Sequence, residues 1–179
     1  DDIVEGNLPV AGPVVVYDDD HYYMGGIIAQ MLAQAGLSVT LVTPGPEVSH
    51  WTRYTMEQPR IEALLRRLGV HLEVNHKLTD VFPGRVVAIS NLTTDMQSID
   101  AVSLVLVTAR DPASTLYFEL AGIEEERREE LPFTLERIGD CLAPSTIAAA
   151  VYHGHRYARE LDLDIDRDDV PFRREYAVI

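Results

Sequence analysis

The sequence predicts an α/β protein whose main domain is a doubly wound parallel sheet. Short β-branched and aliphatic runs alternate with segments of helical periodicity along the first 110 residues. Glycine and proline mark the ends of these segments. A β-α-β-α-β order, followed by a hairpin and one more strand, is typical of a doubly wound domain. We therefore expect a linker over residues 1–12, this domain over 13–110 and a different unit over 111–179.

The expected strands of the main domain are short hydrophobic runs of the kind that a buried parallel sheet requires. They are predicted at residues 13–17, 38–43, 70–74 and 102–107. Two further segments, 78–82 and 85–89, alternate between apolar and polar residues on either side of Pro83 and Gly84. This pattern predicts a β-hairpin.

Two helices are expected between these strands. The first covers residues 22–35, where apolar residues recur at helical spacing, and Gly36 follows as a stop signal. The second covers residues 60–68 and ends before Gly69. Pro59 at its start suits the first turn of a helix.

The character of the chain changes after Arg110. Residues 124–130 are a dense charge run, which predicts a solvated helix or loop. Residues 134–138 are compatible with a strand, and residues 147–161 with a helix rich in small side chains. The remainder, 162–179, has no core of its own.

Composition excludes several classes of function. With 15 Lys and Arg against 29 Asp and Glu, the formal net charge is −14, so neither nucleic acid nor an anionic membrane surface is an expected partner. No apolar run is long enough to span a bilayer. Cys141 is the single cysteine, which excludes a disulfide within the chain and a cysteine-ligated iron–sulfur cluster. We expect a cytoplasmic protein and, because no initiator Met is present, a fragment of a longer chain.

The turn after the first strand carries the most informative residues. A Rossmann-like domain keeps glycines there, so that backbone amides reach a pyrophosphate at the start of the helix. Here residues 18–20 are three aspartates, and only Gly25 and Gly26 remain as candidate cofactor-binding residues or as packing contacts between helix and strand. One contact between a carboxylate and a phosphate at about 4 Å costs ~1 kcal/mol in water and roughly four times that at an effective dielectric of 20. Two or three carboxylates that face a diphosphate would therefore oppose its binding by several kcal/mol.

The end of the second strand is equally unusual. An acid for a ribose hydroxyl, or a base for a 2′-phosphate, normally stands there. This chain has Thr43 and Pro44, with Glu47 only nearby. Three interpretations follow for the first turn: a nucleotide site that has been lost, an unusual nicotinamide site, or a metal site on the aspartates. The last is weak, because three adjacent residues on one turn rarely converge on one ion.

A second signal is the pair Gly139-Asp140 between the expected strand 134–138 and the expected helix 147–161. A strand that ends in Gly-Asp before a helix recurs in flavin-binding domains of disulfide-reductase type, where the Asp binds a ribityl or ribose hydroxyl. Asp near a helix start is also a common cap. Gly139 and Asp140 are therefore candidates for cofactor contacts or for a cap.

Four segments together carry a family resemblance. They read Tyr-Asp-Asp-Asp-His-Tyr-Tyr-Met-Gly-Gly over 17–26, Val-Thr-Leu-Val-Thr-Pro over 39–44, Ile-Gly-Asp-Cys-Leu-Ala-Pro over 138–144 and Ala-Ala-Ala-Val-Tyr-His-Gly-His-Arg over 148–156. They resemble the C-terminal part of the trimethylamine dehydrogenase / NADH:flavin oxidoreductase family. Dimethylamine and histamine dehydrogenases and, further off, 2,4-dienoyl-CoA reductase belong to it.

The resemblance implies a longer parent enzyme, an oxidoreductase with an N-terminal barrel that carries FMN and a 4Fe-4S cluster. Two domains resembling those of glutathione reductase follow the barrel. Residues of about 11–110 match the NADPH-domain-like unit, and residues of about 130–161 match the return of the chain into an incomplete FAD-like domain, which in amine dehydrogenases holds ADP rather than FAD. The resemblance also implies an electron-transferring flavoprotein as electron acceptor.

We accordingly expect no catalytic residue, no metal and no cofactor in this fragment alone, and a structural role in which Asp140 helps to complete an ADP site. The main partner would be the remainder of the parent chain, with a homo-oligomer as a further expectation. Two alternatives stay open. One is a working NAD(P)H-binding domain of a flavin-dependent reductase, in which Gly25 and Gly26 take the phosphates. The other is a docking module for an electron-transferring flavoprotein.

Overall fold

The computed structural model describes residues 3–6, 9–108, 110–126 and 135–162. The chain divides into two compact units, the first ending at Ala109 and the second beginning at Arg110. The elements of the first unit are β1 (Val14–Asp18), α1 (Met24–Gln34), β2 (Val39–Val42), the 3-10 helix η1 (His50–Thr55), α2 (Gln58–Arg67), β3 (His71–Glu73), β4 (His76–Phe82), β5 (Arg85–Ser90), β6 (Met96–Asp100) and β7 (Ser103–Val107).

A four-stranded parallel sheet forms the centre of the first unit, with the strand order β3-β2-β1-β7. In β1, Val14, Val15 and Val16 are all fully buried, as expected of a central parallel strand that is covered on both faces. The four predicted parallel strands and both predicted helices are confirmed, with their ends shifted by no more than two residues.

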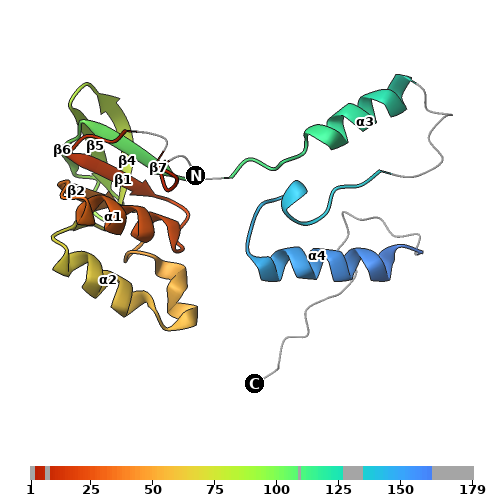
Figure 1. Cartoon of the computed structure of the whole chain (residues 1–179), viewed down its shortest axis with the longest axis horizontal. Helices are drawn as coiled ribbons and strands as arrows, with labels where there is room; N and C mark the ends of the chain where they lie inside the picture. Colours follow the sequence, from red (N-terminus) through yellow and green to blue (C-terminus); the bar gives the residue numbers. More distant parts are fainter. Residues whose placement is uncertain (1–2, 7–8, 109, 127–134, 163–179) are drawn as a thin grey trace. The chain divides into compact units, whose positions relative to one another are not determined.

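Side chains of β1 alternate between two hydrophobic cores, because successive residues of a strand point to opposite faces. Val14 and Val16 pack with residues of α1 and α2, including Ile28 and Leu65. Val15 packs on the other face, against residues of β5. The parallel sheet is therefore a middle layer between α1 and α2 on one side and the strands β4, β5 and β6 on the other, as Figure 1 shows.

The strands β4, β5 and β6 form an antiparallel sheet. The predicted hairpin across Pro83 and Gly84 is confirmed, and Gly84 takes the left-handed backbone conformation with φ of +80°. The strand β6 was not predicted. Its residues pair with β5, but alternate ones are exposed, and Met96 is 68% exposed. A half-exposed strand of this kind has too few apolar residues to be predicted from its sequence pattern.

The second unit contains α3 (Thr115–Glu126), the 3-10 helix η2 (Gly139–Cys141) and α4 (Ile147–Glu160). The predicted helix after residue 146 is confirmed, and the Thr146 side chain accepts a hydrogen bond from the Ala149 N–H as its cap. The predicted strand over 134–138 is wrong for residues 135–138, which pair with no strand in the described part of the chain. Residue 134 and the end of the charge run, 127–130, lie outside the described residues, as does the segment after residue 162.

Within the ranges that the structure describes, no helix has the length and apolar character needed to cross a membrane. In the first unit, the residues before β1 contact the main core. Ile3 and Val10 pack against it, and the Ala11 N–H donates a hydrogen bond to Ser103 Oγ at 3.1 Å.

Candidate functional site

The candidate site lies at the carboxyl ends of β1 and β2, where open parallel sheets bind ligands. Two connections meet there. We call residues 18–23, between β1 and α1, the first loop, and residues 43–57, between β2 and α2, the second loop. These loops carry the positions at which the sequence predicts a lost or an unusual dinucleotide site.

Asp18 is the last residue of β1, and its side chain points into the protein rather than toward solvent. The residue has 0% relative exposure. Its Oδ1 accepts hydrogen bonds from the backbone N–H groups of Asp20 at 3.2 Å and His21 at 3.1 Å. Its Oδ2 is buried and has no hydrogen-bond partner. The carboxylate thus takes two loop amides of the kind that a pyrophosphate would otherwise use.

Burial raises the pKa of the Asp18 carboxyl from 3.8 to about 6. The hydrogen bonds from the His21 and Asp20 amides act in the opposite direction, because they favour the charged form. Desolvation outweighs them, which is consistent with the unpartnered Oδ2. At neutral pH the group is still mainly ionised, since the pH lies above its pKa.

Gly25 is required by Asp18. A Cβ added to Gly25 would lie 2.4 Å from Asp18 Cγ, 2.5 Å from Oδ2 and 2.6 Å from Cβ. No carbon–carbon or carbon–oxygen contact of that length is tolerated between non-bonded atoms. The glycine at the start of α1 therefore makes room for an acid of the protein itself.

Gly26 has a comparable role toward the second loop. A Cβ added there would lie 3.2 Å from Ser49 Oγ and 3.3 Å from Ile61 Cγ2. Ser49 is buried and has the left-handed backbone conformation, with φ of +51°. Both glycines thus pack the helix start against neighbouring elements, and their assignment to a cofactor remains a prediction.

His21 links the two loops. Its Nδ1 lies 3.3 Å from Thr43 Oγ1, and its Nε2 lies 3.3 Å from the exposed Asp19 carboxylate. A carboxylate only accepts, so Nε2 carries a proton in this arrangement, and in the neutral ring the Thr43 hydroxyl donates to Nδ1. Its backbone has φ of +59°, and its carbonyl oxygen accepts from the Trp51 N–H at 3.0 Å.

The order Thr43–His21–Asp19 is that of a nucleophile, a base and an acid. The structure argues against this chemistry, because Thr43 has 0% relative exposure and its Oγ1 also accepts the Gly45 N–H at 3.2 Å. A buried hydroxyl that already holds two partners cannot reach a substrate. The His21 bridge therefore fixes the loops together.

Glu47 is also engaged within the second loop. Its carboxylate pairs with Arg53, whose Nη2 donates at 2.9 Å, and with His50 Nδ1 at 3.0 Å. Its carboxylate oxygens are therefore not free to bind a ribose hydroxyl. This agrees with the sequence-based expectation that the end of the second strand lacks the acid that usually binds this hydroxyl.

The outer face of the second loop is aromatic. The rings of Trp51 and Tyr54 stack with their centroids 5.7 Å apart, and the residues are 46% and 81% exposed. The same loop is anchored by Thr55 and Glu57, which both bind the Tyr23 hydroxyl of the first loop. The hydrogen bond between Tyr23 and Glu57 raises the pKa of Tyr23 and lowers that of Glu57.

Sequence reasoning drew attention to the aspartates but did not assign roles to His21, Thr43 or Ser49. No local signal distinguishes them, since the left-handed backbone of His21 and Ser49 becomes visible only in the folded loops. Among the described residues, no group of three or more His, Cys, Asp or Glu side chains is placed to hold a metal ion.

The predicted Gly139-Asp140 pair lies in the second unit, in η2. Gly139 has φ of +59°, and Asp140 is exposed, with its Oδ1 accepting the Ser145 N–H at 3.3 Å. Asp140 therefore closes the loop before α4, while Thr146 caps the helix itself. A ligand contact through Asp140 remains a prediction.

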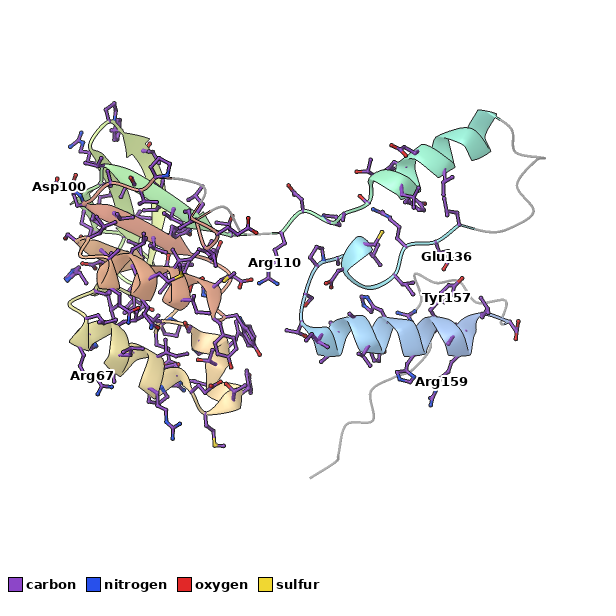
Figure 2. The ribbon with its side chains drawn as sticks, viewed as in Figure 1. Arg67, Asp100, Arg110, Glu136, Tyr157 and Arg159 are labelled. Carbon is purple, nitrogen blue, oxygen red and sulfur yellow. The ribbon has the colours of Figure 1, made fainter. Side chains whose placement is uncertain are left out.

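A cavity of about 500 Å³ lies beside this pair, between α4, α3 and the extended residues 135–138. Figure 2 shows Tyr157 on the side of α4 that faces the segment carrying Glu136, with Arg159 on the opposite side. Residues of both charges line the cavity, among them Arg156 and Glu160, and Arg156 Nε donates a hydrogen bond to Glu160 Oε1 at 2.9 Å. Arg137, also in the lining, lies 4.7 Å from the ring centroid of Tyr117.

Comparison with known proteins agrees with this architecture. The family model described as the OYE-like second alpha/beta domain matches residues 1–107. A histamine dehydrogenase structure from Rhizobium sp. 4-9 is 40% identical with a TM-score of 0.83, over 99% of this chain and 28% of that chain. The 6-hydroxypseudooxynicotine amine oxidase of Pseudomonas geniculata N1 is 35% identical with a TM-score of 0.77, over 87% of this chain and 23% of that one.

A curated relative, dimethylamine dehydrogenase of Hyphomicrobium sp. (strain x), is 27% identical over 191 residues, covering 97% of this chain and 26% of that protein. The chain thus spans about a quarter of the length of these relatives. The resemblance inferred from the aspartate-rich first loop and the Gly-Asp segment is confirmed. This chain belongs to the family of OYE-like second alpha/beta domains.

Proposed function

We propose that this chain is the C-terminal part of an amine dehydrogenase-like oxidoreductase and that its first unit is a Rossmann-like domain with a structural rather than a cofactor-binding role. The similarity to amine dehydrogenases over nearly the whole chain supports the parent class. The domains would then be a lead-in over 1–12, the Rossmann-like unit over 13–110 and a returning segment of an FAD-like domain over 111–179.

The observation that carries the structural role is the position of Asp18. Its buried carboxylate accepts the Asp20 and His21 amides, and Gly25 leaves space for this acid. A dinucleotide phosphate would have to displace a negative charge that is covalently part of the loop. Asp19, half exposed at the mouth of the same loop, would add like-charge repulsion.

The parent's redox groups would lie outside this chain. A 4Fe-4S cluster requires several cysteine thiolates, and Cys141 alone does not fit one. We assign FMN and the cluster to the remainder of the parent. Asp140 fits a nucleotide contact better, because the Ser145 amide holds one of its oxygens in place at an exposed position before α4. We propose that it contributes to an ADP site completed by other parts of the parent.

A titration with NADH and NADPH tests the structural role of the first unit. Trp51 is the single tryptophan and lies on the second loop, so its fluorescence reports binding near the site. We expect no saturable change up to millimolar nucleotide at about 150 mM salt. Micromolar binding would instead support the alternative, a working NAD(P)H-binding domain of a flavin-dependent reductase.

The ADP proposal is tested separately, in the full-length parent. Asp140→Ala should weaken ADP binding there, while Asp111→Ala, in the segment before α3, should leave it unchanged. Equal ADP affinity in the parent and in the Asp140 variant would contradict the assignment.

The exposed Trp51–Tyr54 stack favours a second function, docking of an electron-transferring flavoprotein. Aromatic side chains on a well-anchored loop are typical anchors of protein interfaces. A pull-down of such a flavoprotein by the parent should weaken when both rings are replaced by alanine. Unchanged capture by the double variant would argue against this function.

A further inference from the structure

The helix α4 turns its polar side toward its own unit. With about 3.6 residues per helical turn, His153, Arg156, Tyr157 and Glu160 share one face. They line the cavity that α4 forms with α3 and residues 135–138. Glu160 is only 4% exposed, and both of its carboxylate oxygens accept from Arg156 Nε, at 2.9 and 3.1 Å. The charged groups of the helix are thus partly closed off by the second unit itself.

The opposite face of α4 is apolar and exposed. We call this face the outer stripe; its residues are Ile147, Ala148, Val151, Tyr152, His155 and Ala158, all exposed. Ile147, Val151 and Tyr152 are 85%, 54% and 55% exposed. Figure 2 shows Arg159, in the last turn, on the side of α4 away from Tyr157. A helix on the surface of a globular protein normally has the reverse arrangement, with its apolar face inward.

The second unit offers α4 no hydrophobic core. Where the structure describes its side chains, over 110–122 and 135–162, the buried residues are Ser114 and Glu160, and neither is apolar. A helix of 14 residues is only marginally stable in water when it stands alone, and most helical stability in proteins comes from packing of the apolar face. The helix α4 therefore requires an apolar surface from outside this unit.

We propose that the outer stripe is the docking face of α4 for the remainder of the parent chain, which covers it with an uncharged, aliphatic surface. The inference rests on the proposed function in taking this chain as part of a longer oxidoreductase. The histamine dehydrogenase structure matches 99% of this chain but only 28% of its own length is covered, so most of such a parent lies outside these residues. The small side chains of Ala148 and Ala158 allow close approach of a packed element.

Hydrogen exchange followed by mass spectrometry tests the proposal on the 179-residue chain and on the full-length parent. In the 179-residue chain, the α4 amides should exchange nearly as fast as those of an unprotected peptide. In the parent they should exchange at least ~100-fold more slowly, because opening of the helix then requires loss of the docked surface. Peptides from β1, in the core of the first unit, should be protected in both and show that each protein is folded. Equal exchange of α4 in the two proteins would overturn the proposal.

A charge at the centre of the outer stripe gives a second test. Val151→Asp should speed the exchange of α4 in the parent by about tenfold or more, because the carboxylate is buried there without a partner. It should change nothing in the 179-residue chain. The matched control is Val81→Asp in β4, where the valine is 62% exposed, and it should leave α4 unchanged in both proteins. An effect of Val151→Asp no larger than that of Val81→Asp in the parent would overturn the proposal. If the Val151 variant of the parent does not fold, the comparison of the two unaltered proteins decides alone.

Other occupants of the outer stripe give different results. A second copy would make the 179-residue chain a dimer in sedimentation, and Val151→Asp would make it a monomer. Coverage by residues 163–179 would protect α4 in the 179-residue chain, and removal of these residues would abolish the protection. Either result would overturn the proposal. A parent whose flavin no amine reduces would contradict the proposed function, whereas unprotected α4 amides in the parent contradict the docking face alone.

Discussion

Replacing Gly25 by alanine should reveal how closely α1 is packed on Asp18. The new Cβ would lie 2.4 to 2.6 Å from three Asp18 atoms, two of which are close to the backbone of β1 and cannot swing away. Overpacking of this kind costs about 1–3 kcal/mol or more. Alanine is otherwise preferred to glycine in a helix by about 1 kcal/mol, so the observed loss understates the clash.

A double-mutant cycle separates these effects. In an Asp18→Gly background the clash is absent, and Gly25→Ala should become neutral or stabilising by up to about 1 kcal/mol. The helix preference of alanine cancels in the cycle, so the coupling free energy equals the cost of the clash, about 1–3 kcal/mol or more. Asp18→Ala should relieve it less, because Asp18 Cβ itself lies 2.6 Å from the new methyl group. Gly26→Ala, with contacts of 3.2 and 3.3 Å, should cost less than Gly25→Ala.

Urea unfolding followed by circular dichroism measures each free energy, and an unchanged m-value shows that the unfolding reaction is the same. The reasoning is refuted if Gly25→Ala is as stable as the unaltered chain. It is also refuted if the cost of Gly25→Ala is the same with and without the Asp18 side chain.

Three further outcomes are expected. Because burial raises the pKa of Asp18 to about 6, this carboxyl is protonated in the folded chain but ionised in the unfolded chain between about pH 4 and 6. The free energy of unfolding of the unaltered chain should therefore rise by about 1 kcal/mol relative to that of Asp18→Asn when the pH falls from 7.5 to 5. Denaturant titrations in which the two chains differ by the same free energy at both pH values would contradict this. Thr146→Ala removes the cap of α4 and should cost about 1 kcal/mol and some helical circular dichroism signal, unlike Ser145→Ala. Replacing the exposed Tyr54 by alanine should change the free energy of unfolding by less than about 0.5 kcal/mol.

Much of the fold follows from periodicity in the sequence. The apolar spacing of α1 and the glycine after it placed that helix within two residues of its ends, because the helix buries one face against the sheet. The elements that were missed bury little. In α3, Leu116 and Phe118 are 67% and 59% exposed, so the helix lacks the apolar stripe that sequence reasoning requires.

The candidate site was only partly predictable. The sequence shows three consecutive aspartates, which suggests a uniformly acidic rim. In the folded protein Asp18 turns inward and Asp19 outward, because β1 continues through Asp18 and Gly25 leaves space beside it. The bond between His21 and Thr43 joins residues 22 positions apart, so it depends on the pairing of β1 with β2 and leaves no local pattern.

The most direct test of the central claim follows the Asp20 and His21 backbone amides by NMR while NADPH is added to the unaltered chain at pH 7.5. If the Asp18 carboxylate holds these two N–H groups, their signals stay unchanged up to millimolar nucleotide. Saturable shifts of both signals at micromolar NADPH would show that a phosphate takes the place of the acid, and would contradict the claim.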